Sequence, residues 1–196
     1  MQYQPSKDIF VKHLHNPDLP SSPSSDSYRG IFQDDKGLIW LGGDFDGVNF
    51  FDPGSLLFST LFPFKNHLNE RGRGVGRGFA EDRNGVVWMG THDGVSRFDP
   101  RSGQYTFWRN AVNKKPVLYD NVVRTMYCDN DGNIWIGTAS GVNRYNAETL
   151  QMEFISPELL PDAFYNSITQ DREGNIWFCN NSKASLHWYV PAENKF

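Results

Sequence analysis

The residues best suited to ligand chemistry in this chain are arginines that recur at a fixed distance from a glycine. Arg29, Arg77 and Arg124 each stand eight residues before a glycine of a repeated motif, and Asn166 takes this position in the fourth copy. A guanidinium can form two parallel hydrogen bonds with a carboxylate or sulfate, so arginines gathered at one place would suit an acidic sugar. The alternative is structural, with each arginine paired to a carboxylate of its own or a neighbouring repeat.

A second group of polar residues occupies short loops between the predicted strands. Asp46, His92 and Asp93 are in these loops. In a four-stranded meander, the loop between the second and third strands lies at the same end as the start of the first strand, and loops on a rigid scaffold are common recognition sites. We therefore expect one ligand-binding site, with solvated loops that bind nothing as the alternative. Its predicted members are Arg29, Arg77, Arg124, His92, Asp93 and Asp46.

The sequence predicts no catalytic residue, metal site or cofactor. None of the five histidines has ligand spacing with a cysteine or carboxylate partner. Residues 129–133 resemble the start of a calcium loop, but the bidentate acid that should follow is missing. No nucleophile elbow, phosphate loop or dinucleotide fingerprint is present. His92 with Asp93 is the one local candidate for a general base.

The elements that would position these residues come from a motif repeated four times. It begins with Asp, has Gly at the fourth position and Trp at the seventh, and the tryptophans are 48, 47 and 42 residues apart. This period is typical of propeller blades, and such a unit buries its apolar faces only by stacking on its neighbours. The four copies are residues 34–42, 82–90, 129–137 and 171–179, with the glycines Gly37, Gly85, Gly132 and Gly174 and the tryptophans Trp40, Trp88, Trp135 and Trp177.

The third repeat shows the expected local structure. β-Branched and aromatic residues predict strands at 122–128, 133–137, 142–145 and 151–155, separated by turns rich in Asp, Asn and Gly. This is a four-stranded antiparallel meander, the blade of a β-propeller. The four motif tryptophans are predicted to be buried between blades, because their large apolar area fills that gap. Trp108 and Trp188 fall outside the series and are predicted at the exposed outer rim.

We predict an all-β chain in which residues 1–196 form one partial propeller. A lone outer strand is expected at 8–14, followed by repeats at about 28–64, 75–110, 121–156 and 165–196. A closed ring of four blades is the alternative, but four is the lower limit for this architecture and the cores look too wide for it. A fragment of a larger, seven-bladed ring is therefore favoured, with open ends that promote self-association.

Composition excludes several other classes of protein. The net charge of −4 is mild and argues against a dedicated nucleic-acid binder. The short Arg-Gly run at 71–78 lacks interleaved aromatics and is better explained as a loop at the channel mouth. No signal peptide or membrane span is apparent within the chain. Cys128 and Cys179 are predicted to be buried free thiols, with a disulfide as the alternative.

The repeat pattern resembles that of the two-component regulator propeller family. Residues 82–100 match the family pattern nearly throughout, 129–146 almost as well, and 34–53 with one extra residue. The fourth copy departs most, since Cys179 stands where the others have glycine. The resemblance implies the periplasmic sensor half of a hybrid two-component regulator, with two seven-bladed propellers, a β-sandwich, a membrane span and a cytoplasmic histidine kinase.

The same resemblance implies an oligosaccharide or other small ligand, and as partners the remaining blades of the parent protein and a second receptor copy. No enzymatic activity is expected in this segment, and nucleic acid is not expected as a partner. Two rival functions stay open. Streptogramin lyases have a similar repeat on a seven-bladed propeller, and would require metal-dependent turnover; an interaction scaffold would bind a protein but no sugar.

Overall fold

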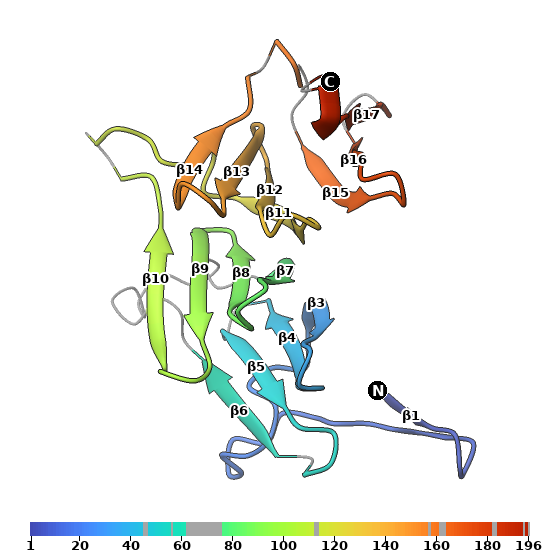
Figure 1. The fold of residues 1–196 in the computed structure, drawn as a ribbon. Coiled ribbons are helices and arrows are strands. Elements are labelled where there is room, and N and C mark those ends of the chain that lie inside the picture. The colour runs from blue at the N-terminus through green and yellow to red at the C-terminus, as the bar shows by residue number, and fades with distance from the viewer. Residues whose placement is uncertain are drawn as a thin grey trace. The chain divides into compact units, whose positions relative to one another are not determined.

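The computed structural model describes residues 1–44, 47–55, 57–61, 76–111, 114–156, 158–160, 164–181, 184–193 and 195. The chain divides into two compact units, Met1–Val75 and Gly76–Phe196, both built from antiparallel sheet (Figure 1). Asp46 and most of the Arg-Gly run lie outside the described residues.

The first unit contains one four-stranded meander and a short hairpin. The strand expected at 8–14 is β2, Ile9–Val11, which pairs with β1, Gln2–Gln4. The rings of Phe51 and Phe58 in the meander pack together with centroids 4.5 Å apart, and His13 contacts both. The meander consists of β3 (Tyr28–Gln33), β4 (Ile39–Gly43), β5 (Val48–Phe51) and β6 (Phe58–Leu61).

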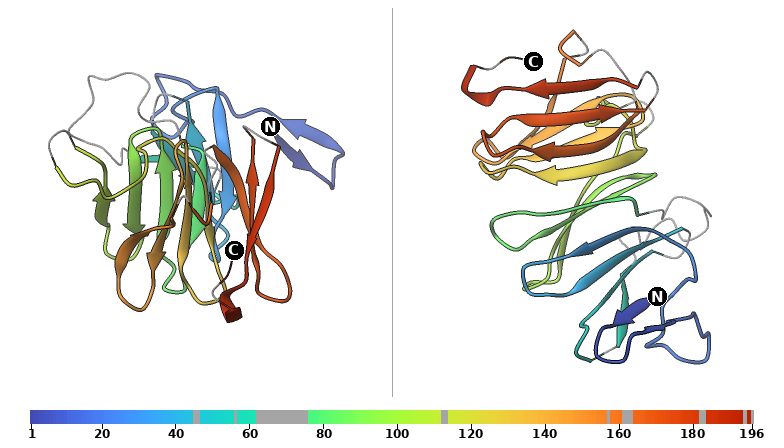
Figure 2. Two further views of the ribbon diagram at one scale, coloured as in Figure 1. Left: turned by 90° about the horizontal axis from the view of Figure 1, so that it is seen from above. Right: turned by 90° about the vertical axis from the view of Figure 1, so that its right-hand side faces the viewer.

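The second unit contains three sheets layered face to face (Figure 2). The first consists of β7 (Gly78–Glu81), β8 (Val87–Thr91), β9 (Gly94–Asp99) and β10 (Gln104–Trp108). The next consists of β11 (Val123–Cys128), β12 (Ile134–Thr138), β13 (Val142–Asn146) and β14 (Gln151–Phe154). The last consists of β15 (Tyr165–Gln170), β16 (Ile176–Asn180) and β17 (Leu186–Tyr189).

The predicted meanders are confirmed, including the four strands of the third repeat. All four motif glycines have φ between 70° and 91°, a conformation that glycine adopts without steric cost. The fourth repeat differs from the prediction at its end. After β17, a single 3-10 turn at Pro191–Glu193 is followed by an isolated bridge between Val190 and Lys195, and no fourth strand appears among the described residues.

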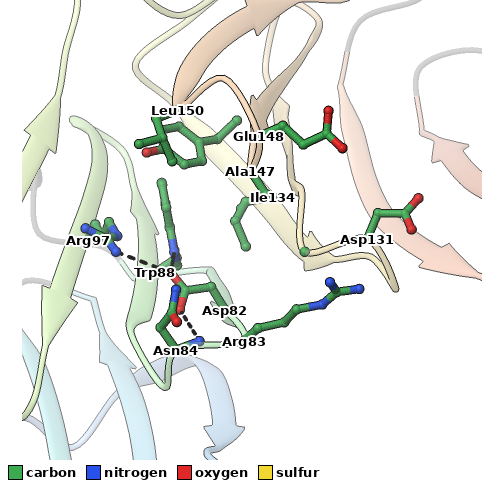
Figure 3. A pocket seen from close by; sticks show the side chains of 12 residues that line it. Asp82, Arg83, Asn84, Trp88, Arg97, Asp131, Ile134, Ala147, Glu148 and Leu150 are labelled. Atoms are coloured by element: carbon green, nitrogen blue, oxygen red, sulfur yellow. Dashed lines mark hydrogen bonds and ion pairs between the residues drawn. The ribbon is translucent and has the colours of Figure 1, made fainter.

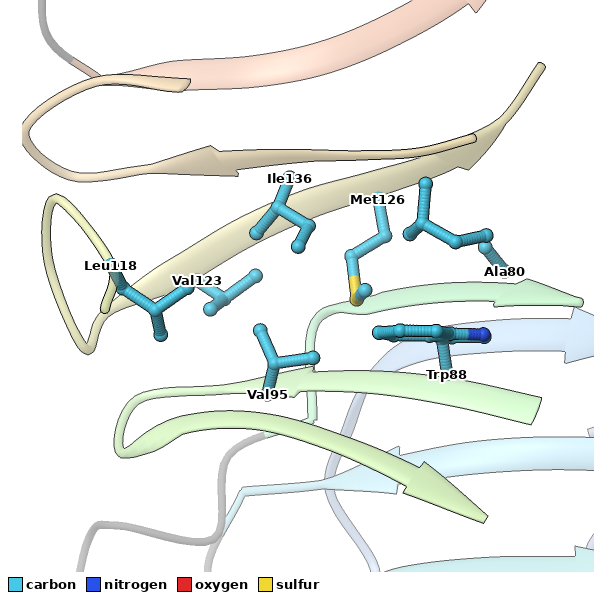
Figure 4. Close-up of a cluster of buried hydrophobic side chains, with 8 residues drawn as sticks. Ala80, Trp88, Val95, Leu118, Val123, Met126 and Ile136 are labelled. Carbon is cyan, nitrogen blue, oxygen red and sulfur yellow. The ribbon is translucent and has the colours of Figure 1, made fainter. Parts of the chain in front are cut away.

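Each sheet of the second unit has two unlike faces. The motif tryptophan lies on one, which we call the tryptophan face, and the residues on either side of it in the same strand lie on the opposite face. Figure 4 shows the tryptophan face of β7–β10, with Trp88, packed against Met126 and Ile136 of β11–β14. The tryptophan face of β11–β14, with Trp135, packs in the same way against Phe178 of the last sheet.

This packing explains why the second and third repeats have glycine at the last position of the motif. A Cβ atom on Gly90 would lie 2.3 Å from Cγ1 of Val123 in the next sheet, and one on Gly137 would lie 2.8 Å from the carbonyl oxygen of Tyr165. These contacts are shorter than a side chain can accept, so the tight sheet stacking requires glycine there. Cys179 holds the same position in the last sheet and is exposed, so its side chain meets no such obstacle.

The four motif tryptophans are not all buried to the same extent. Trp40, Trp88 and Trp135 are at most 1% exposed, as predicted. The prediction of full burial is wrong for Trp177, which is half-buried and stacks on Trp188 with ring centroids 5.3 Å apart. Trp188 is exposed as expected, whereas Trp108 is half-buried and stacks on Trp88 at 5.2 Å. The outer strand therefore contributes to the core in the second repeat.

The two cysteines are free and differ in accessibility. Cys128 is half-buried, and burial, together with the nearby Asp129 carboxylate, raises the pKa of its thiol to about 11. Cys179 is exposed, so the prediction of a buried thiol is wrong for it.

We expect iodoacetamide at pH 8 to alkylate Cys179 at least about a hundredfold faster than Cys128, because the thiolate is the nucleophile and only about one in a thousand Cys128 thiols would be ionised. Mass spectrometry of peptides after timed quenching measures both rates. A Cys179→Ser variant should stay unlabelled when folded and acquire one label in urea. Comparable rates at the two cysteines in the folded protein would contradict this.

Candidate functional site

The predicted arginines share one structural position at the start of the innermost strands. The pairing of β3 with β4 shifts between Tyr28 and Gly30, so Arg29 is the extra residue of a β-bulge, and the same shift in β11 makes Arg124 the extra residue. Arg77 immediately precedes β7 and donates its backbone N–H to Gly90 O at 3.0 Å. A bulge residue is released from the ladder and its side chain is re-aimed, which is common at binding sites.

Arg29 forms an ion pair within its own sheet. Its Nε donates to Oδ1 of Asp44 at 2.5 Å, and Asp44 is also hydrogen-bonded by Ser27. The hydrogen bond to Asp44 is the largest cause that raises the pKa of Arg29, and the Coulombic attraction of the same carboxylate is the second. Arg29 thus pairs with a carboxylate of its own repeat, which is the structural alternative to ligand binding that the sequence analysis named.

Arg124 lies against the ring of Phe164, the residue that immediately precedes β15 of the next sheet. Its guanidinium carbon is 5.4 Å from the ring centroid of Phe164, and its buried Nε has no hydrogen-bond partner among the described residues. Phe164 is 42% exposed and has a φ of 62°, which is uncommon for a residue with a bulky side chain. Such strained positions cluster at functional sites. Sequence reasoning missed Phe164, because only the fold brings it to Arg124.

Arg77 and Arg124 lie at the same end of the second unit. The strands that they introduce are adjacent: a Cβ atom on Gly78 would be 2.9 Å from the backbone nitrogen of Met126. Arg77 and Arg124 are both half-buried, so part of each side chain reaches solvent. Two of the three predicted arginines thus lie at the starts of neighbouring strands of one compact unit, together with an exposed aromatic ring.

The His92–Asp93 turn is at the same end, between β8 and β9. Asp93 is 3% exposed, and its Oδ1 lies 3.0 Å from Nε of Arg109. The backbone N–H of Asp93 donates to the Thr91 hydroxyl at 3.0 Å, which fixes the turn. His92 is half-buried. Asp93 therefore holds a buried ion pair, whereas Asp46 lies outside the described residues.

A carboxylate–indole contact occurs in all four repeats and was also missed in the sequence. One oxygen of the motif Asp accepts two backbone N–H groups of its turn, as at Asp129, where Asp131 N and Asn133 N lie 3.0 and 2.8 Å away. The other oxygen accepts the indole N–H of the tryptophan six residues later. The Nε1–Oδ2 distances are 2.9 Å at Asp34, 3.1 Å at Asp82, 2.7 Å at Asp129 and 2.7 Å at Asp171. The constant spacing of six residues between the Asp and the Trp was the sequence signal that could have predicted this hydrogen bond.

These contacts give the Asp and Trp of the motif a structural role. The hydrogen bond from Trp177 is the largest cause that holds the pKa of Asp171 below its ordinary value. Among the residues that the structure describes, no group of three or more His, Cys, Asp or Glu side chains is arranged to hold a metal ion. The same described part contains no helix of the length and apolar character needed to cross a bilayer.

A cavity of about 300 Å³ lies at the other end of the second unit, beside the motif turns of its first two sheets (Figure 3). It is lined by the turn that contains Asp82, Arg83 and Asn84, by the Trp88 and Arg97 side chains, and by residues between Asp131 and Leu150. This cavity was not predictable from the sequence, because it forms between two repeats.

Comparison with known proteins places these features in a family context. Residues 120–140 and 159–182 match the profile of the two component regulator propeller family. No curated protein sequence matches at a significant level. Among solved structures, the chain is similar to the extracellular domain of the hybrid two component system BT3049 from B. thetaiotaomicron, with 20% identity and a TM-score of 0.74 over 98% of this chain and 24% of that one.

Two further structures support the fold. The extracellular domain of the hybrid two component system BT4673 from B. thetaiotaomicron is 22% identical, with a TM-score of 0.67 over 86% of this chain and 24% of that one. Virginiamycin B lyase from Staphylococcus aureus is 13% identical, with a TM-score of 0.60 over 88% of this chain and 59% of that one. The chain thus spans about a quarter of the length of the two-component domains that it resembles. It is an all-β chain of propeller type, two segments of which match the two component regulator propeller family.

Proposed function

We propose that this chain is part of the periplasmic sensor region of a two-component regulator and helps to detect an oligosaccharide. The observation that carries the proposal is the family match of two repeats, combined with the likeness of nearly the whole chain to an extracellular domain of a hybrid two component system. In this proposal a histidine kinase elsewhere in the parent protein receives the signal. Ligand binding would act by favouring one of two receptor arrangements, which shifts the signalling equilibrium.

We assign ligand binding to the end of the second unit that carries Arg77, Arg124 and His92. Arg124 with Phe164 supports this assignment, since an exposed ring can stack on the apolar face of a sugar while the guanidinium binds a carboxylate or sulfate. Asp46 lies outside the described residues and is not part of this assignment. The ion pairs of Arg29 with Asp44 and of Asp93 with Arg109 favour structural roles for Arg29 and Asp93.

The test is calorimetric titration of the intact receptor with neutral and acidic oligosaccharides. We expect Arg77→Ala and Arg124→Ala each to weaken binding of the acidic ligand at least about tenfold, the loss expected when one charge-assisted contact is removed. Arg101→Ala is the matched control, because among the described residues this exposed arginine pairs only with Asp99 at the turn before β10. If both test variants bind within twofold of the parent, the arginines are structural and the assigned site is wrong.

The lyase alternative is favoured only by the fold likeness to virginiamycin B lyase. It would need a general base, and the candidate His92–Asp93 pair has its carboxylate engaged by Arg109. Incubation of the intact protein with a streptogramin B antibiotic and magnesium, followed by mass spectrometry, tests it. Magnesium-dependent consumption of the antibiotic would favour the lyase over the sensor.

We also propose further blades of the parent and a second receptor copy as partners. The exposed tryptophan face of the last sheet, with Trp177 and Trp188, supports an additional sheet there, because Trp88 and Trp135 on the equivalent faces are covered. Sedimentation velocity of the intact receptor with and without oligosaccharide tests dimerisation. A monomer under both conditions would exclude the second copy.

A further inference from the structure

Asn166 holds, in the last sheet, the position that Arg124 holds in the sheet before it. The pairing of β15 with β16 shifts between Tyr165 and Ser167, so Asn166 is the extra residue of a β-bulge, as Arg124 is in β11. Asn166 is exposed, and its amide makes no hydrogen bond to any residue that the structure describes. A bulge residue is released from the ladder, so this amide can meet a ligand.

Asn166 and Arg124 are neighbours at one end of the second unit. The guanidinium carbon of Arg124 is 5.4 Å from the ring centroid of Phe164, and Phe164 stands two residues before Asn166. Two residues of extended chain span about 7 Å. The strand that Arg77 precedes, β7, packs against β11 as well. Arg77, Arg124 and Asn166 therefore follow one another at the starts of three adjacent strands.

The backbone around Phe164 is fixed from two sides. Its N–H donates to the carbonyl oxygen of Ala139 at 3.3 Å, between β12 and β13, and its carbonyl oxygen accepts the N–H of Asn181 at 3.2 Å. These bonds hold Phe164 at its φ of 62°. Asn181 follows β16 and is exposed like Asn166. The last sheet thus contributes a fixed ring and two accessible amides to this end of the unit.

The three adjacent positions change from charged to neutral along the row. The guanidinium groups of Arg77 and Arg124 carry charge and only donate hydrogen bonds, which suits a carboxylate or sulfate. The amide of Asn166 both donates and accepts, and so does a sugar hydroxyl, which makes the amide a partner for an uncharged sugar. A carboxylate placed at Asn166 would gain no ionic attraction from it. The row therefore suits a ligand whose charge is confined to one part.

We propose that Asn166 is a specificity-determining residue, and that the ligand is an oligosaccharide in which an acidic sugar is linked to a neutral one. Arg77 and Arg124 bind the acidic sugar, and Asn166 with Asn181 binds the hydroxyl groups of the neutral sugar beside it. This inference rests on the proposed oligosaccharide site and names the class of ligand that the site selects.

The test is isothermal titration calorimetry of the intact receptor with three tetrasaccharides. Hyaluronan tetrasaccharide alternates a uronic acid with a neutral sugar, tetragalacturonic acid is acidic throughout, and cellotetraose is neutral. The hyaluronan tetrasaccharide should bind at least about tenfold more tightly than either of the others, because it alone matches both parts of the row. Equal binding of the two acidic ligands overturns this inference but not the proposed function. Failure of all three to bind contradicts both.

Two variants locate the selectivity at Asn166. Asn166→Arg supplies the residue that the other three repeats have, so it should raise the affinity for tetragalacturonic acid at least about tenfold. Asn166→Ala should weaken binding of the hyaluronan tetrasaccharide at least about fivefold, since hydrogen bonds to the neutral sugar are lost.

Asn84→Arg is the matched control for the added charge. Asn84 is exposed in the turn between β7 and β8, at the opposite end of the unit, so both acidic ligands should bind this variant within twofold of the parent. Because Asn166 is exposed, its variants should keep the circular dichroism spectrum of the parent. A folded Asn166→Arg variant with both acidic affinities within twofold of the parent overturns the role of Asn166.

Discussion

Replacing Trp135 by alanine is expected to lower the free energy of unfolding by about 3–5 kcal/mol, the usual loss for a fully buried large aromatic side chain. Trp135 is 1% exposed and packs against Phe178 and Tyr189 of the next sheet, with ring centroids 5.4 and 5.6 Å away. Its removal would leave a void at the contact between two sheets. Urea unfolding followed by circular dichroism measures the effect.

Trp188→Ala is the matched control for this change. Trp188 is 49% exposed and packs only on Trp177 among the aromatic side chains described. We expect a clearly smaller loss than for Trp135, since about half of the Trp188 surface stays in water in the folded chain. Equal losses for the two variants would show that the stacked sheets are not what stabilises the second unit.

Asp129→Ala is expected to cost about 2–4 kcal/mol, because it removes a buried carboxylate that has several partners. Asp129 is 7% exposed, and its loss would strand the Trp135 indole N–H, which now donates to Oδ2 at 2.7 Å. A buried donor without a partner costs about 1–3 kcal/mol in itself, and the turn also loses its two backbone contacts. The stability of Asp129→Asn should lie between that of the parent protein and that of Asp129→Ala. An amide keeps one acceptor oxygen, but its NH₂ group replaces the other oxygen and places a donor next to one of the donors that Asp129 now binds.

Asp131→Ala, in the same turn, is the control for Asp129. Its side chain is exposed, so unfolding by urea should change by no more than about 0.5 kcal/mol. Because Asp129 and Trp135 share one hydrogen bond, the double variant Asp129→Ala/Trp135→Ala should lose less than the sum of the single losses. Additive losses would show that the bond contributes nothing to stability.

Periodicity and turn chemistry were sufficient to predict the strands and the buried Trp40, Trp88 and Trp135. Both signals are local: alternating apolar residues mark a strand, and glycine marks a turn that needs positive φ. Burial of Trp177 was not predictable from the motif, since burial depends on whether another sheet covers the residue. The Asp, Gly and Trp of the motif are all present around Trp177, but the surroundings of this tryptophan differ from those of the others.

The candidate site was predictable only in part. The constant spacing correctly put Arg29, Arg77 and Arg124 at one position of each repeat, which the backbone of β3 and β11 converts into a bulge. Which arginine would find a carboxylate was not predictable, because Asp44 reaches Arg29 from another strand. Phe164 and the cavity at Arg97 depend on neighbouring repeats, so no single copy of the motif contains their signal.

The unlike faces of the sheets restrict the symmetry of any assembly built through them. Trp135 meets Phe178 across one junction and Trp88 meets Met126 across another, so the stack has a direction, like the polarity of a filament. A two-fold axis would bring a face against its own copy, which is not the pairing that either junction uses. Contacts through the free face at Trp177 are therefore expected to be heterologous, giving a ring if the rotation closes and an open array if it does not. A two-fold dimer of the receptor would need a surface other than these faces.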